Sequence, residues 1–310
     1  MILDPTVLVL GAGASHDYEF PLGSALVDII LGALLPEYES TAYYQSVLVA
    51  AATAGATPQH IETFRRALAE SQRSSVDRFL QTRQEFLAVG KAAIAAALIP
   101  GEMYKTLIAP RGRWVSYLLD GMIGDADPDS FRANRLTVVT FNFDRSFERL
   151  LFLALKASYG LTDAAAADLA AHVPVYHVHG DLGAPAWMPT TSRSELQRPY
   201  EPECTPDLVT LAASRIRLVH EEVTDETLAP AWAALEAATR IYLIGCGFHK
   251  TNMERLRLNG ALPNASMQAT AKGCTEMELV PVREFCRQRI ALHPGYDAQQ
   301  FVRNVELFKW

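Results

Sequence analysis

The chain has 310 residues, and its 28 Lys and Arg against 35 Asp and Glu give a formal net charge of -7. No Lys or Arg precedes Arg65, whereas this opening stretch contains the acidic residues Asp4, Asp17, Glu19, Asp28, Glu37, Glu39 and Glu62. An acidic N-terminal segment followed by a chain of balanced charge argues against binding to duplex DNA or to an anionic membrane, because such partners need clustered Lys and Arg.

The hydrophobic content of 49% is enough for a packed core, and the longest apolar stretches, 22–35 and 92–99, fall short of the roughly 20 residues that span a bilayer. The N-terminus has neither a basic n-region nor an Arg-rich amphipathic helix, so we expect a cytoplasmic protein. Four cysteines without CxxC spacing predict reduced thiols and no metal site; they are Cys204, Cys246, Cys274 and Cys286.

The first predicted element is a strand over 6–10, a continuous apolar run of the kind buried on both faces of a parallel sheet. It ends in the turn Gly11-Ala12-Gly13-Ala14-Ser15, which would let the backbone approach a phosphate. A full dinucleotide fingerprint would have a third glycine where this chain has His16, and the acidic residue expected about 20 residues later is missing. A hydride-transferring dehydrogenase is therefore disfavoured, and the turn alone leaves both nucleotide binding and a plain structural turn open.

Helical patterns dominate the next hundred residues. Thr57 and Pro58 predict a helix start, and Val76, Phe79 and Leu80 have the spacing of an amphipathic helix. We expect a single domain over 1–310, with a helical insertion at about 25–132 and a Rossmann-like core at about 1–24 and 133–310. The Ala-rich helices of the insertion would form either an assembly surface or simply a helical core.

The β pattern returns in the C-terminal half, where helices are expected at 147–156 and 230–239. Strands alternating with helices predict an α/β fold with a mostly parallel sheet. The strands are expected at 136–141, 173–179, 215–219 and 240–244, and one more strand and a terminal helix follow Asn259. The proline-rich segment 187–207 is either a binding loop or a plain surface loop.

Polar residues lie at the ends of two of these predicted strands. Asn142 and Asp144 come after the second strand, where they could face a crevice or cap the helix that carries Glu148. His177 and His179 share one face of the next strand, and His179 at its tip is the better candidate for a general base. A metal-binding His-x-His pair would need further ligands, and no cluster with suitable spacing accompanies it.

A second Gly-rich turn, Gly245-Cys246-Gly247, follows the strand at 240–244, with Asn252 shortly after. Two such turns at two strand ends could together hold a pyrophosphate. Because the first 64 residues contain no basic side chain, the first turn would have to bind it through backbone N–H groups.

These motifs, in this order, resemble the SIR2-like family of bacterial NAD-consuming proteins, which are distant relatives of sirtuins. The turn 11–15 with Pro21-Leu22-Gly23 is similar to the family's first motif, and the stretch 75–80 resembles its Ser-Ile-Asp-x-Phe-Leu element. Residues 140–144 match its Thr-x-Asn-Tyr-Asp motif, His179-Gly180 its catalytic His-Gly, and 245–248 with Asn252 its late Gly-rich loop. The four-cysteine zinc module of true sirtuins is absent from the sequence.

The resemblance implies an enzyme that cleaves the bond between nicotinamide and ribose in NAD, with NAD as substrate and hydrolysis during antiphage defence as the usual outcome. Asn142 would hold the ribose and water, His179 would accept a proton, and Asp144 would orient the pair. The cofactor cradle would consist of Gly11, Ala12, Gly13, Ser15, Asn142, Gly245, Gly247 and Asn252. The family also implies a homo-oligomer and a defence partner such as a hexameric ATPase or an Argonaute-like protein.

Two alternatives remain open. The chain could be a non-catalytic nucleotide-binding or assembly module in which Asn142 merely caps a helix. It could instead be a protein deacylase or ADP-ribosyltransferase, which would release nicotinamide only with an acylated peptide or an acceptor protein.

Overall fold

Strand β1 (Thr6–Leu10) lies near the middle of the fold and is buried along its whole length, as the apolar run predicts. In the computed structural model, which describes residues 1–109, 113–189, 197–259, 262 and 265–308, β1 pairs in parallel with β2 (Leu136–Thr140) on one side and with β6 (Arg240–Ile244) on the other. Its first residue, Thr6, is in register with Leu136 and with Arg240. Segments far apart in sequence therefore meet along one strand.

The described part of the chain forms a six-stranded parallel sheet in the order β3-β2-β1-β6-β7-β8, with β3 at Val175–His177, β7 at Ser266–Thr270 and β8 at Ile290–His293. A minor pair joins β4 (Ala184–Pro185) to β5 (Gln197–Arg198). The predicted Rossmann-like α/β fold is confirmed. The chain winds in opposite directions from β1 and from β6, and ligands of such sheets collect at this reversal.

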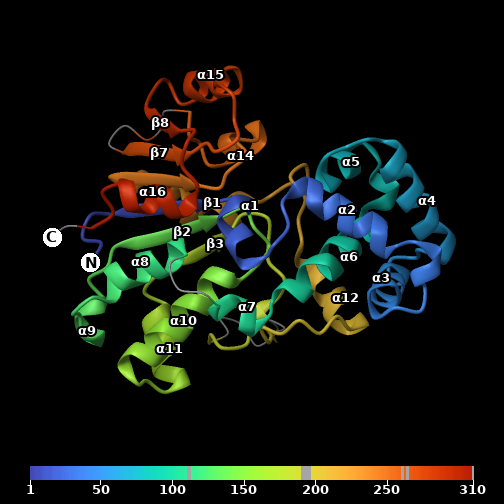
Figure 1. Cartoon of the computed structure of the whole chain (residues 1–310), viewed down its shortest axis with the longest axis horizontal. Coiled ribbons are helices and arrows are strands. Elements are labelled where there is room, and N and C mark those ends of the chain that lie inside the picture. Colours follow the sequence, from blue (N-terminus) through green and yellow to red (C-terminus); the bar gives the residue numbers. More distant parts are fainter. Residues whose placement is uncertain (110–112, 190–196, 260–261, 263–264, 309–310) are drawn as a thin grey trace.

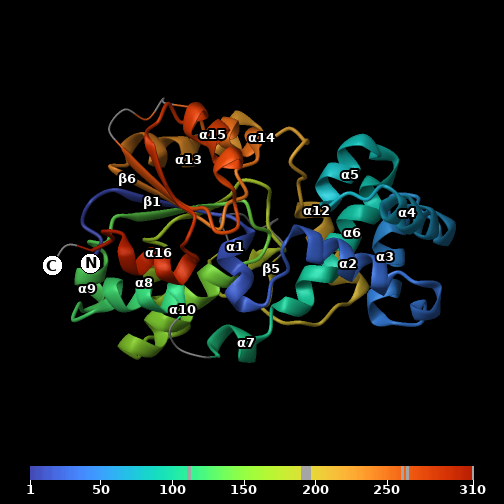
Figure 2. The ribbon, with the colours of Figure 1, turned by 45° about the horizontal axis from the view of Figure 1, so that its top comes forward.

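Helices cover both faces of the sheet (Figures 1 and 2). Leu8 and Leu10 of β1 share a core with helices α8, α10 and α16, whereas Val7 and Val9 share another with α13, α14 and α15. This alternation follows from the twofold period of a strand. The helices are α1 Ala12–Ser15, α2 Gly23–Ala33, α3 Ala42–Ala52, α4 Pro58–Glu70, α5 Val76–Thr82, α6 Leu87–Leu98, α7 Tyr104–Ile108, α8 Trp114–Ile123, α9 Pro128–Phe131, α10 Ser146–Tyr159, α11 Asp163–Ala170, α12 Pro206–Arg215, α13 Asp225–Ala237, α14 Lys250–Arg255, α15 Glu276–Phe285 and α16 Ala298–Asn304.

Helices α2 to α6 form a lobe beside the sheet, as Figure 1 shows on its right. Helix α6 packs against α2, α3 and α4, and α12 joins the lobe by packing on α3 and α6, although it lies more than 100 residues further along the chain. Helix α8 instead packs on α10 and α16 beside the sheet. Residues 25–132, expected as one helical insertion, thus contribute to two parts of the fold. The helix start expected at Thr57 and Pro58 is confirmed.

The strand expected at 215–219 is wrong. Arg215 ends helix α12, and residues 216–219 lie outside the sheet. Ile216 and Leu218 are buried while Arg217 is exposed, so the alternation that predicts a strand arises from an irregular segment crossing the end of β3. Its contact there is a hydrogen bond of 2.8 Å from the Arg217 N–H to the His179 carbonyl.

Other boundaries also differ from expectation. Helix α13 begins at Asp225, five residues before Pro230, because the Thr224 hydroxyl caps it by accepting from the Thr227 N–H. Pro230 therefore lies inside the helix. Strand β3 is shorter than expected, and two strands, not one, follow Asn259 before the expected terminal helix. The centre of the predicted loop 187–207 lies outside the described residues. No helix of the described chain is long and apolar enough to cross a membrane.

Candidate functional site

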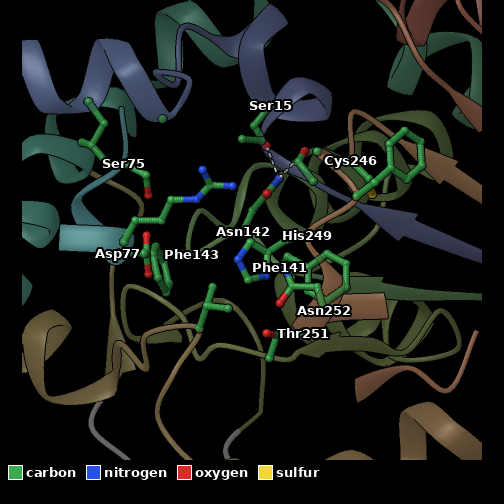
Figure 3. A pocket seen from close by; sticks show the side chains of 18 of the residues that line it. Ser15, Ser75, Asp77, Phe141, Asn142, Phe143, Cys246, His249, Thr251 and Asn252 are labelled. Atoms are coloured by element: carbon green, nitrogen blue, oxygen red, sulfur yellow. Dashed lines mark hydrogen bonds between the residues drawn. The ribbon is translucent and has the colours of Figure 1, made fainter. Parts of the chain in front are cut away.

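A cavity of about 430 Å³ opens where the strand order reverses, at the carboxyl ends of β1, β2 and β6. One wall comes from the sheet, with Ala12, Asn142 and Gly247, and the opposite wall comes from the lobe, with Ser75 and Asp77 at the start of α5. Figure 3 shows Ser75 and Asp77 on one side and Ser15, Asn142 and Cys246 on the other. Of the residues predicted for the site, Gly11, Ala12, Ser15, Asn142, Asp144, Gly247 and Asn252 line this cavity.

The two Gly-rich turns pack directly against each other. A Cβ on Gly11 would lie 2.6 Å from the Gly245 oxygen, and one on Gly13 would lie 2.8 Å from the Gly245 Cα. The N–H groups of Gly11 and Gly13 donate to the carbonyls of Ile244 and Gly245, at 2.9 and 3.0 Å. Gly13 and Gly245 therefore lie behind the cavity wall and do not line the cavity. Of the N–H groups of Gly11, Ala12 and Gly13, only that of Ala12 makes no hydrogen bond among the described residues.

The two glycines of the second turn are expected to respond differently to substitution. Gly245 has φ +67°, and a Cβ there would lie 2.2 Å from the Ala14 nitrogen, so Gly245→Ala must push β1 and β6 apart at their ends. We expect a loss of roughly 3 kcal/mol or more in the free energy of unfolding, measured by urea denaturation. Gly247→Ala is the matched control, since no atom lies within 4 Å of its Cβ position. Equal stability of the two variants would contradict this packing.

Asn142 is held by its side-chain NH₂ group and by its backbone N–H group. Its side-chain Nδ2 donates to the Gly11 carbonyl and to the Ser15 hydroxyl, both at 3.0 Å, and its backbone N–H donates to the Thr140 hydroxyl at 3.0 Å. The Oδ1 atom makes no hydrogen bond within the described part of the chain. Asn142 thus presents a fixed acceptor to the cavity from the end of β2.

Asp144 is buried, and its Oδ1 accepts from the backbone N–H of Ser146 at 3.1 Å and from the Ser146 hydroxyl. It therefore satisfies the N-terminus of α10, one of its two expected roles. Burial raises the pKa of Asp144, opposed by hydrogen bonds from Ser146 and Ser15. Its link to Asn142 runs through the Ser15 hydroxyl, and none of its hydrogen bonds in the described chain reaches His179.

His179 does not line the cavity. It is 2% exposed, its Nε2 hydrogen bonds to the Asn252 Oδ1 at 2.9 Å, and its ring lies 5.7 Å from that of Phe141. Arg255 donates to Nδ1 at 3.3 Å, so the Nε2 carries the proton. Burial, helped by the Arg255 charge and opposed by the hydrogen bond to Asn252, lowers the pKa of His179 to about 4. The ring is neutral at pH 7, and Asn252 stands between it and the cavity.

His177 holds the backbone carbonyl of Asn142. Its Nδ1 donates to the Asn142 carbonyl at 2.9 Å, and its Nε2 donates to the Glu148 carboxylate at 2.7 Å. Burial lowers the pKa of His177, but the charge and hydrogen bond of Glu148, helped by Asp181, outweigh this and raise the pKa to about 9. The core histidine is therefore a cation paired with α10, and it fixes the backbone that carries Asn142.

This pair predicts a pH dependence of stability. The pKa of folded His177 lies above the unfolded value of 6.5, so the pair stabilises the fold below pH 6.5 and its contribution is lost as the pH rises to about 9. We expect a loss of up to about 3 kcal/mol across this window that is absent from Glu148→Gln. Urea denaturation at pH 6.5 and 9 measures it, with His16→Gln, at an exposed site, as control. Identical pH slopes for wild type and Glu148→Gln would contradict the pairing.

Four charged or imidazole side chains that line the cavity were not among the predicted site residues. Asp77 and Arg78 lie in the stretch 75–80 that resembles the family's insertion element, whereas His220 and His249 carry no sequence signal. Burial raises the pKa of Asp77. Both ring nitrogens of His220 and the Nδ1 of His249 are buried without a hydrogen bond. These atoms are donors and acceptors beside the cavity that a ligand could satisfy.

Neither a protein-family model nor a curated protein is found to match this chain. The chemistry of the cavity therefore has to follow from its own residues. In the described ranges, no group of three or more His, Cys, Asp and Glu side chains is placed to hold a metal ion. The polar groups of the cavity are suited to a ligand rich in hydroxyl, amide and phosphate groups.

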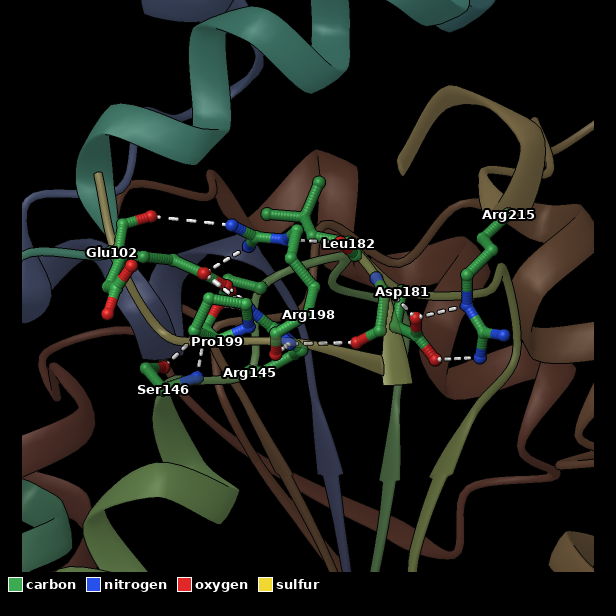
Figure 4. Close-up of polar contacts among 11 residues, drawn as sticks. Glu102, Arg145, Ser146, Asp181, Leu182, Arg198, Pro199 and Arg215 are labelled. Carbon is green, nitrogen blue, oxygen red and sulfur yellow. Dashed lines mark hydrogen bonds and ion pairs between the residues drawn. The ribbon is translucent and has the colours of Figure 1, made fainter. Parts of the chain in front are cut away.

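A buried ion cluster holds the segments beside the site (Figure 4). Glu102 accepts from Arg145 at 2.9 Å and also pairs with Arg198, and all three side chains are fully buried. Arg145 also donates to the carbonyls of Gly183 and Pro199, each at 2.9 Å. The cluster ties the end of α6 and its following turn to the start of α10, next to Asp144, and to the chain after β3.

Proposed function

We propose that this protein binds NAD in the cavity and hydrolyses the bond between nicotinamide and ribose, giving nicotinamide and ADP-ribose. The proposal joins the resemblance to SIR2-like NAD-consuming proteins with the chemistry of the cavity. A fixed asparagine and two joined Gly-rich turns beside the aromatic side chains of Phe141, Phe143 and Phe248 suit a dinucleotide, which combines flat rings with polar sugars and phosphates.

The observation that carries the proposal is the position of Asn142. Its amide is anchored on Gly11 and Ser15 of the first turn, while its Oδ1 stays open to the cavity. Departure of nicotinamide leaves positive charge on the ribose, and an acceptor fixed in advance can stabilise that charge or hold the attacking water. A plain helix cap would not need this anchoring, and Asp144 already accepts from the Ser146 N–H at the start of α10.

His179 would act through Asn252 in the arrangement seen here. The neutral ring carries its proton on Nε2, so it could accept a proton there only if Asn252 turned away and the ring proton moved to Nδ1, which would then have to release its contact with Arg255. Catalytic hydrogen bonds often form only with substrate bound. We therefore keep His179 as the proposed base and Asn252 as the side chain that connects it to the ligand.

The burial of His179 behind Asn252 favours a second candidate function, a nucleotide-binding module without turnover. A histidine that stays buried behind Asn252 has no route to a proton of the substrate. Protein deacylation or ADP-ribosyl transfer is a third outcome, recognised by nicotinamide release that requires an acylated peptide or an acceptor protein.

The experiment is to follow NAD and nicotinamide by chromatography while calorimetry measures ADP-ribose binding to the same preparation. We expect nicotinamide to appear from NAD without an acyl substrate. ADP-ribose binding without any nicotinamide release would select the binding module, and release only with an acylated peptide would select the deacylase.

The proposed biological role is NAD depletion during antiphage defence, carried out by a homo-oligomer with a defence partner. It rests on the resemblance alone. A bacterium carrying the wild-type gene should lose NAD on phage infection, whereas one carrying Asn142→Ala should retain it.

A further inference from the structure

The positive charge in the cavity comes from the helical lobe. Arg78 of α5 lines the cavity, and it is the one Lys or Arg that does so among the described residues. Its side chain is exposed, and it forms no ion pair or hydrogen bond within the described chain. A free guanidinium in a dinucleotide-sized cavity is an available partner for an anion.

The Gly-rich turns offer a diphosphate neutral donors and no positive charge. A diphosphate bound at the first turn was expected to rely on backbone N–H groups, but those of Gly11 and Gly13 are used by the carbonyls of the second turn. The Ala12 N–H remains, and in the second turn the N–H groups of Cys246 and Gly247 make no hydrogen bond among the described residues. These donors carry no net charge, so a cation in the cavity would add the attraction that the two negative charges of a diphosphate favour.

Arg78 is placed to reach the second turn. Arg78 and His249 line the same cavity, and the Arg78 charge lowers the pKa of His249 after the larger effect of burial. His249 follows Gly247 and Phe248 directly in sequence and lines the same cavity. The neighbouring Phe79 and Leu80 are buried in the lobe and hold this turn of α5 in place.

We propose that Arg78 binds the diphosphate of the dinucleotide and is the main affinity determinant for that part of the ligand. This rests on the proposed function and deepens it by assigning the anion-binding group. Bound ligand would then connect the lobe, through α5, with the carboxyl ends of β1 and β6 (Figure 3).

Isothermal titration calorimetry with ADP-ribose and with adenosine tests the assignment in wild type, Arg78→Ala and Arg78→Lys. We expect Arg78→Ala to weaken ADP-ribose binding roughly 10- to 100-fold, Arg78→Lys to recover part of the loss, and adenosine binding to stay unchanged in both. Arg73→Ala is the matched control, because Arg73 is exposed on the preceding turn and does not line the cavity. The ADP-ribose affinity of wild type should also fall with added salt, and that of Arg78→Ala should fall less.

Wild-type affinity for ADP-ribose in Arg78→Ala would overturn the assignment while leaving the proposed function standing. An equal loss of ADP-ribose and adenosine binding would also overturn it, because the effect would then not belong to the diphosphate. Failure of the wild type to bind ADP-ribose would reject the proposed function, and the assignment with it. Unchanged thermal midpoints of the variants show that they are folded.

Discussion

Asn142→Ala is expected to slow nicotinamide release from NAD by roughly 100-fold or more while the protein still binds ADP-ribose. The substitution removes the open Oδ1 acceptor and the amide anchored on Gly11 and Ser15, but it leaves α10 capped by Asp144. Steady-state release measured by chromatography gives kcat and KM, and we expect the loss to fall mainly on kcat.

Asn304→Ala is the matched control for this substitution, because Asn304 ends α16 on the exposed surface and lies outside the cavity. Its rate should equal that of the wild type. Equal turnover by Asn142→Ala and wild type would remove Asn142 from the chemistry and leave it as part of the turn. A parallel loss of ADP-ribose binding would instead indicate that the cavity itself had collapsed.

Glu102→Ala is expected to destabilise the protein by about 3 to 5 kcal/mol. It leaves the guanidinium groups of Arg145 and Arg198 fully buried without a counter-charge. Arg145 adjoins Asp144 in sequence, so disorder at the cluster should also reach the start of α10. Urea denaturation monitored by circular dichroism measures the change.

The control for Glu102→Ala is Glu85→Ala, which removes the exposed partner of Arg83. A solvent-exposed pair contributes little, so this variant should unfold at the wild-type urea concentration. If Glu102→Ala also unfolded at that concentration, the cluster would not hold the segments it connects.

The central strands could be predicted because burial on both faces requires a continuous run of apolar residues. Strands β1 and β6 are buried on both faces, and each is a continuous apolar run. Strand β7, between β6 and the edge strand β8, contains Ser266 and Gln268 and carries a weaker signal. The segment 215–219 gave a false signal, since burial of Ile216 and Leu218 alternates without any strand pairing.

The site was predictable where the sheet builds it and not where the lobe does. Asn142 and Gly247 follow strands directly, so parallel pairing brings them to one edge. Arg78 and His220 reach the same cavity only through helix packing, which no local pattern encodes. The position of His179 behind Asn252 likewise depends on a contact across 73 residues.

The most direct test of the central claim is to incubate the wild-type protein with NAD in water enriched in oxygen-18 and to analyse the products by mass spectrometry. We predict nicotinamide and ADP-ribose in equal amounts, with one heavy oxygen on the ribose carbon that carried nicotinamide. Intact NAD in a sample whose cavity binds ADP-ribose would contradict it, and so would nicotinamide release without the heavy oxygen in the ribose product.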